Sequence, residues 1–478
     1  MPRNPALILA AMLLTAPVAT AQTRDAGTPP SEERMGIDSV FGPHMVVQRD
    51  SPIRIWGRAA PGEAVRISLG RAQTRTVAGP DGAWSATLPP RPAGGPYTLE
   101  ASAASFRDLY GDVMIGDVWL CAGQSNMEFR RSKATDLPAD FATDASLRML
   151  DIARREAQTP SPHLMTLGGW AASTPASAAN FSAICHHFGE RLRARLRVPI
   201  GIVNASWGGT RIAAFVDADT LNAHGGASGK IDKVPRQNDG HVFNAMIAPL
   251  APFGLKGVLW YQGESDTHRP EGYQKRLTAL AASWRRAFAQ PLPMIVVQLP
   301  SFDPSPRTPP GHWAQIREAQ RRFVARDNAS GLVVQIDLDT AGDLHPTSKA
   351  VVASRSADTA LSVAYRISRI APGAHPDRIE RRGSTIRLHY QSTEPLTLSD
   401  GRAVRGYELC AETCVAVTGR LAAPRRVDIP LPAQMDARCL RYAWSDVPFS
   451  DLRTTGGWPA GPFAMRLSDL SATDMPCE

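Results

Sequence analysis

A serine stands in the middle of the stretch VWLCAGQSNMEF, residues 118–129. The apolar run before it predicts a buried strand, and Gly123 marks the turn at which that strand ends. A serine on a strand-to-helix turn can be a nucleophile, because neighbouring backbone N–H groups point toward the atom that it attacks. Serine is also common in turns without chemical function, since its hydroxyl group binds nearby backbone. Ser125 is therefore a candidate nucleophile that needs partners elsewhere in the chain.

His345 is the candidate general base. It follows the predicted strand VVQIDLD, and a neutral imidazole can take the proton of a serine hydroxyl and later return it. A carboxylate is then needed to hold the ring and to stabilise its charged form. Asp343 is our first candidate for this carboxylate, because it precedes His345 in the same loop. Its alternative role is that of a turn residue before Pro346.

The oxyanion of an ester hydrolysis intermediate requires hydrogen-bond donors. The candidates are the backbone N–H groups of Ser125 and of the turn Gly208-Gly209, which follows the run GIVNAS, and the side-chain amide of Gln262, which follows GVLWY. Each also has an ordinary structural explanation as a turn or cap residue. Their joint occurrence at predicted strand ends favours a serine esterase, because active sites of open α/β sheets lie at the carboxyl ends of strands.

These strand ends belong to a region in which strands and helices alternate. Its strand candidates are VMIGDVWLCAG, PIGIVNAS, LKGVLWYQG, PMIVVQLP and GLVVQID, and its helix candidates are FSAICHHFGERLRARL, YQKRLTALAASWRRAFA and WAQIREAQRRFVAR. The pattern predicts an α/β domain over residues 111–368, with a parallel sheet and helices on both faces. Short alternating runs with turn residues predict a β-sandwich-like domain over residues 37–110 and a second β domain over residues 369–478.

The N-terminus has the pattern of a signal peptide. Residues 1–21 contain Arg3, an apolar run and the small-x-small sequence Ala19-Thr20-Ala21, which is typical of a cleavage site. A membrane anchor is the alternative, but the run is too short and contains Pro17. We expect an exported protein, periplasmic or extracellular, with a flexible leader over residues 22–36 and no membrane span.

The charge of the chain is mildly positive. The formal net charge is +8, from 53 basic and 45 acidic side chains, and removal of Arg3 with the signal peptide leaves 52 basic residues and a charge of +7. This excess is small for the length of the chain, and no nucleic-acid-binding motif is present. We expect no nucleic-acid partner.

The cysteines fall into two groups. Cys121 and Cys185 lie in apolar runs, so we expect buried, unpaired thiols. The other four cysteines lie in the last 70 residues: Cys410, Cys414, Cys439 and Cys477. An oxidising compartment favours two disulfides among them, with three possible connectivities. A zinc site is the weaker alternative, because paired C-x-x-C spacing is absent.

The blocks GQSNM, WGGT, WYQGESD and DLHP together resemble those of the SGNH (GDSL-type) hydrolase superfamily, and in particular its sialate O-acetylesterase and carbohydrate esterase branch. The stretches FGPHMVVQRDSPIRIWGRAAPGE and LRYAWSDVPFSDLRTTGGWPAGPF are similar to the flanking β regions of that branch. The resemblance implies a three-layer α/β/α domain between two β domains. It also implies hydrolysis of O-acetyl esters on sugars through an acetyl-enzyme, without a metal or organic cofactor.

The chain departs from the superfamily pattern at two places. The first block has Gly-Gln-Ser-Asn in place of Gly-Asp-Ser, although the glutamine form is usual in this branch. The aspartate expected three residues before the histidine is replaced by Gly342, and Asp343 is two residues before His345. Related carbohydrate esterases use the glutamate of WYQGESD, here Glu264, to orient the histidine. We rank Asp343 first, Glu264 second and Asp339 third.

The resemblance also favours Gly208 over Gly209 as an oxyanion donor. The predicted substrate is an acetylated sialic acid or an acetylated polysaccharide or oligosaccharide. Two other functions remain open, namely a lipase or thioesterase of the same superfamily and an inactive carbohydrate-binding protein. The sequence leaves the sugar, the position of the acetyl group and the oligomeric state undetermined.

Overall fold

The computed structural model describes residues 35–228, 232–304, 309–338, 342–367, 373–399, 401 and 403–467. The predicted signal peptide and all but the last two residues of the predicted leader lie outside these ranges. Within them, no helix combines the length and the apolar character that crossing a bilayer requires. The described residues from Met35 onward belong to one compact unit.

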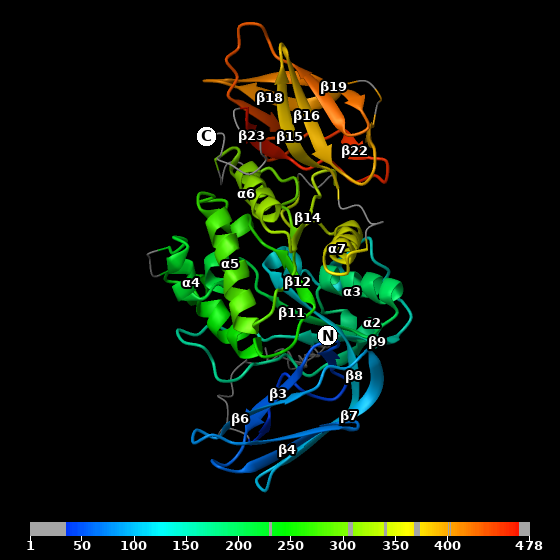
Figure 1. Cartoon of the computed structure of the whole chain (residues 1–478), viewed down its shortest axis with the longest axis vertical. Coiled ribbons are helices and arrows are strands. Elements are labelled where there is room, and N and C mark those ends of the chain that lie inside the picture. Colours follow the sequence, from blue (N-terminus) through cyan, green and yellow to red (C-terminus); the bar gives the residue numbers. More distant parts are fainter. Residues whose placement is uncertain are drawn as a thin grey trace, which may run out of the picture. The chain divides into compact units, whose positions relative to one another are not determined.

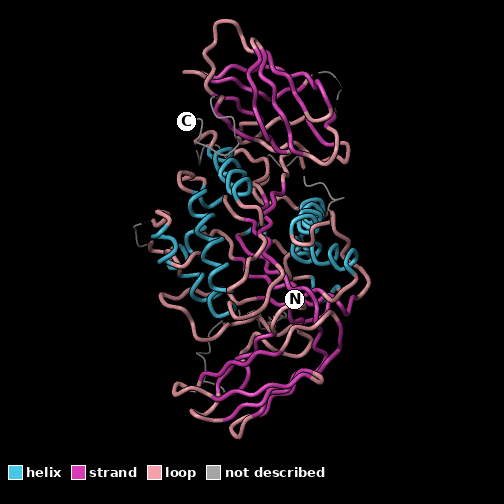
Figure 2. The backbone as a smooth tube through the Cα atoms, viewed as in Figure 1, coloured by secondary structure: helices cyan, strands magenta, loops and turns pink. Residues whose placement is uncertain are grey.

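A largely parallel sheet forms the middle of the protein, and its strands appear in magenta in Figure 2. Its strand order is β10-β9-β11-β8-β12-β13-β14, parallel from β9 to β14, with β10 antiparallel at the edge. The bounds are β8 Arg107–Gly123, β9 Asp144–Asp151, β10 Ala171–Ser173, β11 Ile200–Ser206, β12 Gly257–Tyr261, β13 Met294–Val297 and β14 Ser330–Val333. Strands β11 to β14 are buried throughout, as expected of parallel strands covered on both faces.

The register of this sheet brings three strand ends to one level. Gly123, the last residue of β8, lies opposite Ser206 of β11 on one side and opposite Tyr261 of β12 on the other. The residues that follow these ends therefore meet at one edge of the sheet. This arrangement confirms the predicted strands over these three runs and explains how distant parts of the sequence share one site.

Helices lie on both sides of the sheet in Figure 1, with α3 and α7 on one side and α5 and α6 on the other. The bounds of the helices are α1 Ser125–Glu128, α2 Pro175–Ala178, α3 Ala183–Leu196, α4 Ala218–Ala223, α5 Tyr273–Phe288, α6 His312–Arg326 and α7 Ala350–Val363. Short 3-10 and π segments are η1 Arg131–Lys133, η2 Ile212–Phe215, η3 Pro235–Gln237, η4 Phe243–Ile247, η5 Ala248–Leu250 and η6 Glu264–Asp266. The three predicted amphipathic helices correspond to α3, α5 and α6, whereas α7 was not among the candidates.

Short strands precede the middle sheet. They are β1 Gly36–Ile37, β2 Val46–Gln48, β3 Ile53–Arg58, β4 Ala64–Leu69, β5 Ala72–Val77, β6 Ala83–Leu88 and β7 Gly94–Ser102. Strands β1, β3 and β6 form a separate sheet, and β7 pairs with the first half of β8. The first half of β8 pairs with β7, and the second half of the same strand pairs with β11 and β12 in the parallel sheet. The domain boundary predicted between residues 110 and 111 therefore falls inside one strand.

A second group of antiparallel strands follows α7. Seven strands pair in the order β15-β16-β20-β19-β18-β21-β23, and β17 pairs with β22. Their bounds are β15 His375–Arg382, β16 Thr385–Gln391, β17 Leu396–Leu398, β18 Val404–Cys410, β19 Cys414–Ala423, β20 Arg426–Pro430, β21 Cys439–Tyr442, β22 Leu452–Thr454 and β23 Phe463–Arg466. The short strands expected in this part of the sequence are therefore present.

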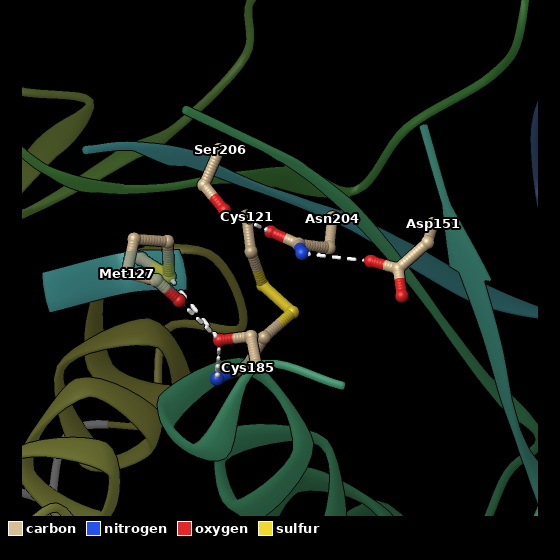
Figure 3. The surroundings of a disulfide bond; sticks show 7 residues. Cys121, Met127, Asp151, Cys185, Asn204 and Ser206 are labelled. Atoms are coloured by element: carbon tan, nitrogen blue, oxygen red, sulfur yellow. Dashed lines mark hydrogen bonds between the residues drawn. A yellow bond between two sulfur atoms is a disulfide. The ribbon is translucent and has the colours of Figure 1, made fainter. Parts of the chain in front are cut away.

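The prediction that Cys121 and Cys185 stay unpaired is wrong. Both are fully buried, as expected, but they form a disulfide with a Cα–Cα distance of 5.9 Å. Figure 3 shows that the bond joins β8 to the N-terminal turn of α3. The two apolar runs that contain these cysteines pack directly against each other, which brings the thiols within bonding distance. The disulfide fixes α3 to the strand that ends at the serine turn.

The cysteines of the C-terminal region follow the prediction in part. Cys410 and Cys414 form a disulfide across the turn between β18 and β19. A nearby carboxylate, Glu408, completes a cluster of potential metal ligands, but paired sulfur atoms are not available as thiolate ligands. Cys439 is also disulfide-bonded, and Cys477 lies outside the described residues.

We predict that the two described disulfides differ in their effect on stability. Replacing both Cys121 and Cys185 by alanine should lower the free energy of unfolding by about 4 kcal/mol, because this bond closes a loop with a sequence separation of 64, which strongly restricts the unfolded chain. The same change at Cys410 and Cys414, separated by 4 positions, should cost about 2 kcal/mol. Urea unfolding followed by circular dichroism measures both variants, and equal losses would contradict the prediction.

Candidate functional site

The serine turn begins with a glycine that no other residue can replace without a shift of the backbone. Gly123 has φ +140°, and a Cβ atom at this position would lie 2.0 Å from the carbonyl oxygen of Tyr261. The close approach of the two strand ends allows the N–H of Gln124 to donate to the same oxygen, at 3.1 Å. Ser125 then begins α1 in a half-buried position. The turn is thus fixed directly against β12.

Gln124 connects the serine turn to the loop after β12. Its side-chain oxygen Oε1 accepts hydrogen bonds from the Nε2 group of Gln262 at 3.1 Å, from the backbone N–H of Ser265 at 3.1 Å and from that of Gly263 at 3.4 Å. Gln124 is 3% exposed, so loss of this acceptor would leave several donors buried without a partner. Its role explains why a glutamine precedes the serine.

The structure brings Ser125 and His345 together. The Nε2 atom of His345 lies 2.8 Å from the Oγ atom of Ser125, so the hydroxyl group can donate to the imidazole when the ring is neutral. Burial lowers the pKa of His345, and the positive charge of Lys349 acts in the same direction, whereas Asp343 and Glu128 oppose both effects. A ring that is neutral near pH 7 is suited to accept the serine proton.

The loop that carries His345 is anchored where it enters α7. The carboxylate of Asp136 accepts the backbone N–H groups of Lys349 and Ala350, each at 2.8 Å, and the hydroxyl group of Ser348 at 2.6 Å. Burial raises the pKa of Asp136, but the hydrogen bonds from Ser348 and from the backbone outweigh it and lower the pKa overall. This arrangement satisfies free N–H groups at the start of the helix and fixes the histidine loop from its C-terminal side.

Asp343 does not hold the imidazole ring in this structure. Its Oδ1 atom accepts the backbone N–H of His345 at 2.8 Å, which is the turn geometry of an aspartate two residues before its donor. The expected bond to the ring atom Nδ1 is absent from the contacts of the described residues. Asp339 lies outside the described residues.

Glu264 is buried close to the serine but contacts a different residue. Its Oε1 atom accepts the side-chain Nδ2 group of Asn126 at 2.6 Å. Burial raises the pKa of Glu264, although the bond from Asn126 and the charge of Lys349 partly oppose this. Neither of the two carboxylates ranked from the sequence is hydrogen-bonded to the imidazole within the described part of the chain.

Two of the predicted oxyanion donors are occupied by other acceptors. The N–H of Gly208 donates to the Oε2 atom of Glu128 at 2.5 Å. The side-chain amide of Gln262 is fully buried and donates to Gln124, to the carbonyl of Thr210 and to Asp266.

The oxyanion roles of Gly208 and Gln262 stay predictions, and in this structure both groups are engaged with protein acceptors. The backbone N–H groups of Ser125 and Gly209 have no acceptor among the described residues, so they are the donors that remain available.

The strand that ends before Trp207 has its own polar support. Ser206 donates to the Oδ1 atom of Asn204, and the Nδ2 group of Asn204 donates to Asp151, each at 2.7 Å, as the dashed lines in Figure 3 show. Burial raises the pKa of Asp151 to about 6 despite the bond from Asn204. This chain of hydrogen bonds fixes the residue next to the Trp207-Gly208-Gly209 turn.

Sequence reasoning missed four residues that build the site: Gln124, Asn126, Glu128 and Lys349. The first three are adjacent to Ser125 in the quoted stretch or one turn of helix away, and Lys349 lies four residues after His345. Their polarity inside or beside apolar runs was the available signal. Their partners lie on other strands and loops, however, so their roles depend on the tertiary structure.

Comparisons with known proteins give a consistent result. A family model described as "Carbohydrate esterase, sialic acid-specific acetylesterase" matches residues 115–361. The chain is 31% identical to human sialate O-acetylesterase over 379 residues, covering 70% of this chain and 72% of the human protein. It is 28% identical to the mouse sialate O-acetylesterase over 429 residues, covering 75% and 79% of the two chains.

A solved structure gives a similar result over a longer part of the chain. The carbohydrate acetylesterase of Xanthomonas citri matches with a TM-score of 0.83 and 32% sequence identity, and the match covers 90% of this chain and 99% of that one. The likeness therefore extends beyond the middle sheet to the β regions on both sides.

We predict that His345 titrates below its ordinary value of 6.5, because burial and the charge of Lys349 both disfavour the imidazolium. The ring signal in a two-dimensional NMR titration, assigned by its loss in the His345→Gln variant, measures the midpoint. In the Asp343→Asn variant the midpoint should fall further, because a negative charge that favours the imidazolium is removed. A midpoint above 6.5 in the unmodified protein would contradict this description of the site.

Proposed function

Because this chain belongs to the carbohydrate esterase family of sialic acid-specific acetylesterases, and is thus a carboxylic ester hydrolase, we propose that Ser125 and His345 remove O-acetyl groups from sugars. The observation that carries this proposal is the 2.8 Å separation of Ser125 Oγ and His345 Nε2 at the carboxyl edge of the sheet. That pair is the minimum apparatus for nucleophilic ester cleavage. We also assign the middle domain to the SGNH type with its β domains on both sides.

The proposed reaction has two halves. His345 takes the proton of Ser125 while Oγ attacks the acetyl carbonyl carbon, and the backbone N–H groups of Ser125 and Gly209 stabilise the oxyanion. The imidazolium then gives its proton to the departing sugar oxygen, which leaves an acetyl-enzyme. Water, deprotonated by His345, attacks the acetyl group, and the second intermediate collapses to acetate while the imidazolium returns this proton to Oγ of Ser125.

A cavity of ≈ 690 Å³ borders two loops of this site, although neither Ser125 nor His345 belongs to its wall. Its wall contains Arg211, Gln237 and Ser265. Gln237 donates to the carbonyl of Gly209, and the N–H of Ser265 donates to Gln124, so the cavity borders both loops of the site. Charged and amide side chains bind hydroxyl groups and disfavour a long acyl chain. We therefore place the sugar here and rank a lipase or thioesterase second.

The proposal includes export. The predicted signal peptide supports it, and so does the Cys121–Cys185 disulfide in the protein core, because disulfides persist mainly in oxidising compartments. An inactive carbohydrate-binding protein is disfavoured by the aligned serine and histidine. Substrates to be compared are O-acetylated sialic acids, acetylated xylan and acetylated xyloglucan oligosaccharides, together with p-nitrophenyl acetate and butyrate.

We expect Ser125→Ala to lose at least about 10³-fold in turnover of p-nitrophenyl acetate, because the remaining groups have no covalent intermediate to stabilise. The unmodified enzyme should hydrolyse the acetate ester and leave the butyrate ester nearly untouched. Circular dichroism serves as the control for folding. Near-normal turnover in the alanine variant would refute the role of Ser125, and equal hydrolysis of both esters would favour the lipase alternative.

In serine hydrolases, loss of the aspartate that holds the catalytic histidine lowers turnover by about 10⁴-fold. We expect smaller losses of turnover on replacing Asp343 or Glu264. Asp343→Asn should lower turnover by less than about 10-fold, because Asp343 is exposed and an exposed charge interaction is worth about 1 kcal/mol or less. Glu264→Gln should cost more, since Glu264 is buried. A loss of about 10⁴-fold in either folded variant would show that this carboxylate binds the imidazole during turnover.

A further inference from the structure

Two opposite charges are buried beside the catalytic serine and are joined through one amide group. The ammonium group of Lys349 donates to the Oδ1 atom of Asn126 at 2.8 Å, and the Nδ2 group of Asn126 donates to Glu264 at 2.6 Å. Asn126 is 0%, Lys349 2% and Glu264 8% exposed. The role of Lys349 is not explained by the reaction steps given above.

Asn126 also reaches the histidine loop. Besides Glu264, its Nδ2 group donates to the carbonyl oxygen of Leu344 at 3.0 Å, and Leu344 directly precedes His345. An amide nitrogen has two hydrogen atoms, so both are used. One side chain, adjacent to the nucleophile in sequence, therefore binds the peptide unit that carries the general base.

Lys349 holds the other end of this amide. The acceptors of Leu344 and Glu264 both face Nδ2, and the ammonium group of Lys349 donates to Oδ1, so the three contacts together fix one position of the side chain. Without the lysine, Oδ1 would be buried with no donor among the described contacts. The amide would then lose the contact that holds it from this side, and its bond to the histidine loop would weaken.

The cost of keeping this charge buried is considerable. Burial lowers the pKa of Lys349 to about 8, although the negative charges of Glu264, Asp343 and Asp136 oppose the effect. The ring of Phe129 lies 4.7 Å from the ammonium group and provides a further favourable contact. An apolar side chain of similar length would avoid the desolvation penalty, so stability alone does not account for a lysine here.

The side chain of Lys349 is also separable from the anchoring of its own backbone. The N–H of Lys349 is held by Asp136, as is that of Ala350, and these bonds do not involve the ammonium group. A methionine at this position retains the backbone anchor and most of the apolar stem. The effect of the charge can therefore be tested without removing the start of α7.

We propose that Lys349 is a positioning residue for the esterase reaction, which fixes the Asn126 amide so that it holds the Leu344–His345 peptide unit against the serine turn. This inference rests on the proposed roles of Ser125 and His345. In this proposal Asn126 makes the contact with the histidine loop. Glu264 is the buried counter-charge that keeps Lys349 protonated.

The test compares Lys349→Met with Lys256→Met as a matched control. Lys256 also places its ammonium group over an aromatic ring, 4.6 Å from that of Tyr365, but has no contact with the serine or histidine loop in the described structure. For p-nitrophenyl acetate, Lys349→Met should lower kcat by about 10- to 100-fold, the range expected for loss of a hydrogen bond to a charged group. KM should stay nearly unchanged, and Lys256→Met should leave both constants close to normal.

The pH profile gives a readout that a purely structural role would not change. The charges that face His345 are those of Lys349, Asp343 and Glu128. Removal of Lys349 takes away the positive one, so the pKa of the acidic limb of kcat/KM should move upward in Lys349→Met. An unchanged profile with unchanged kcat would overturn the proposal.

The rate of Ser125 labelling by diisopropyl fluorophosphate separates this inference from the function on which it rests. A wild-type protein that is not labelled would refute the role of Ser125 itself. Rapid labelling of wild type with equally rapid labelling of Lys349→Met would overturn the positioning role alone. We expect slower labelling of Lys349→Met. We also expect the reductions in labelling rate caused by Lys349→Met and by Glu264→Gln to be non-additive in the double variant.

Discussion

The close approach of the ends of β8 and β12 is the constraint on which the site depends. Gly123 leaves no room for a side chain between its backbone and the carbonyl of Tyr261, so the serine turn and the loop after β12 are in direct contact. This contact lets Gln124 bind two backbone N–H groups and the Gln262 amide of that loop. Ser125, the proposed nucleophile, is thereby fixed by strand register and by hydrogen bonds.

The polar residues beneath the site form two buried networks with different functions. Gln124 and Gln262 join neighbouring strand ends and involve amides and one carboxylate, Asp266. Asn126 instead joins the serine turn to the histidine loop and lies between the charges of Lys349 and Glu264. The first network rigidifies the sheet edge, whereas in the second the charge of Lys349 also acts on the imidazole.

The sequence allowed prediction of those parts of the fold that depend on local pattern. Apolar runs predicted the strands, and the segments that follow them include Ser125 and His345, which the structure brings to 2.8 Å. The errors concern groups whose partners are distant in sequence. Gln262 is buried and bonded to Gln124 and to Tyr273 at the start of α5, and a thiol on β8 meets Cys185 only when α3 packs on the sheet. A lysine next to a proline-containing loop gives no signal in sequence that it is buried.

The superfamily has an aspartate three residues before the histidine, and this chain lacks it. Hydrogen bonds to the backbone of the histidine loop take over part of its role. In this chain the position is Gly342, and three contacts fix the loop by its backbone: Asp343 binds the N–H of His345, Asn126 binds the carbonyl of Leu344, and Asp136 binds the start of α7. When the backbone on both sides of a histidine is fixed, the ring needs less help from a carboxylate at Nδ1 to stay aligned with Ser125. The imidazolium is then stabilised by charges at longer range, those of Asp343 and Glu128. One set of groups aligns the ring, and another set stabilises its charged form.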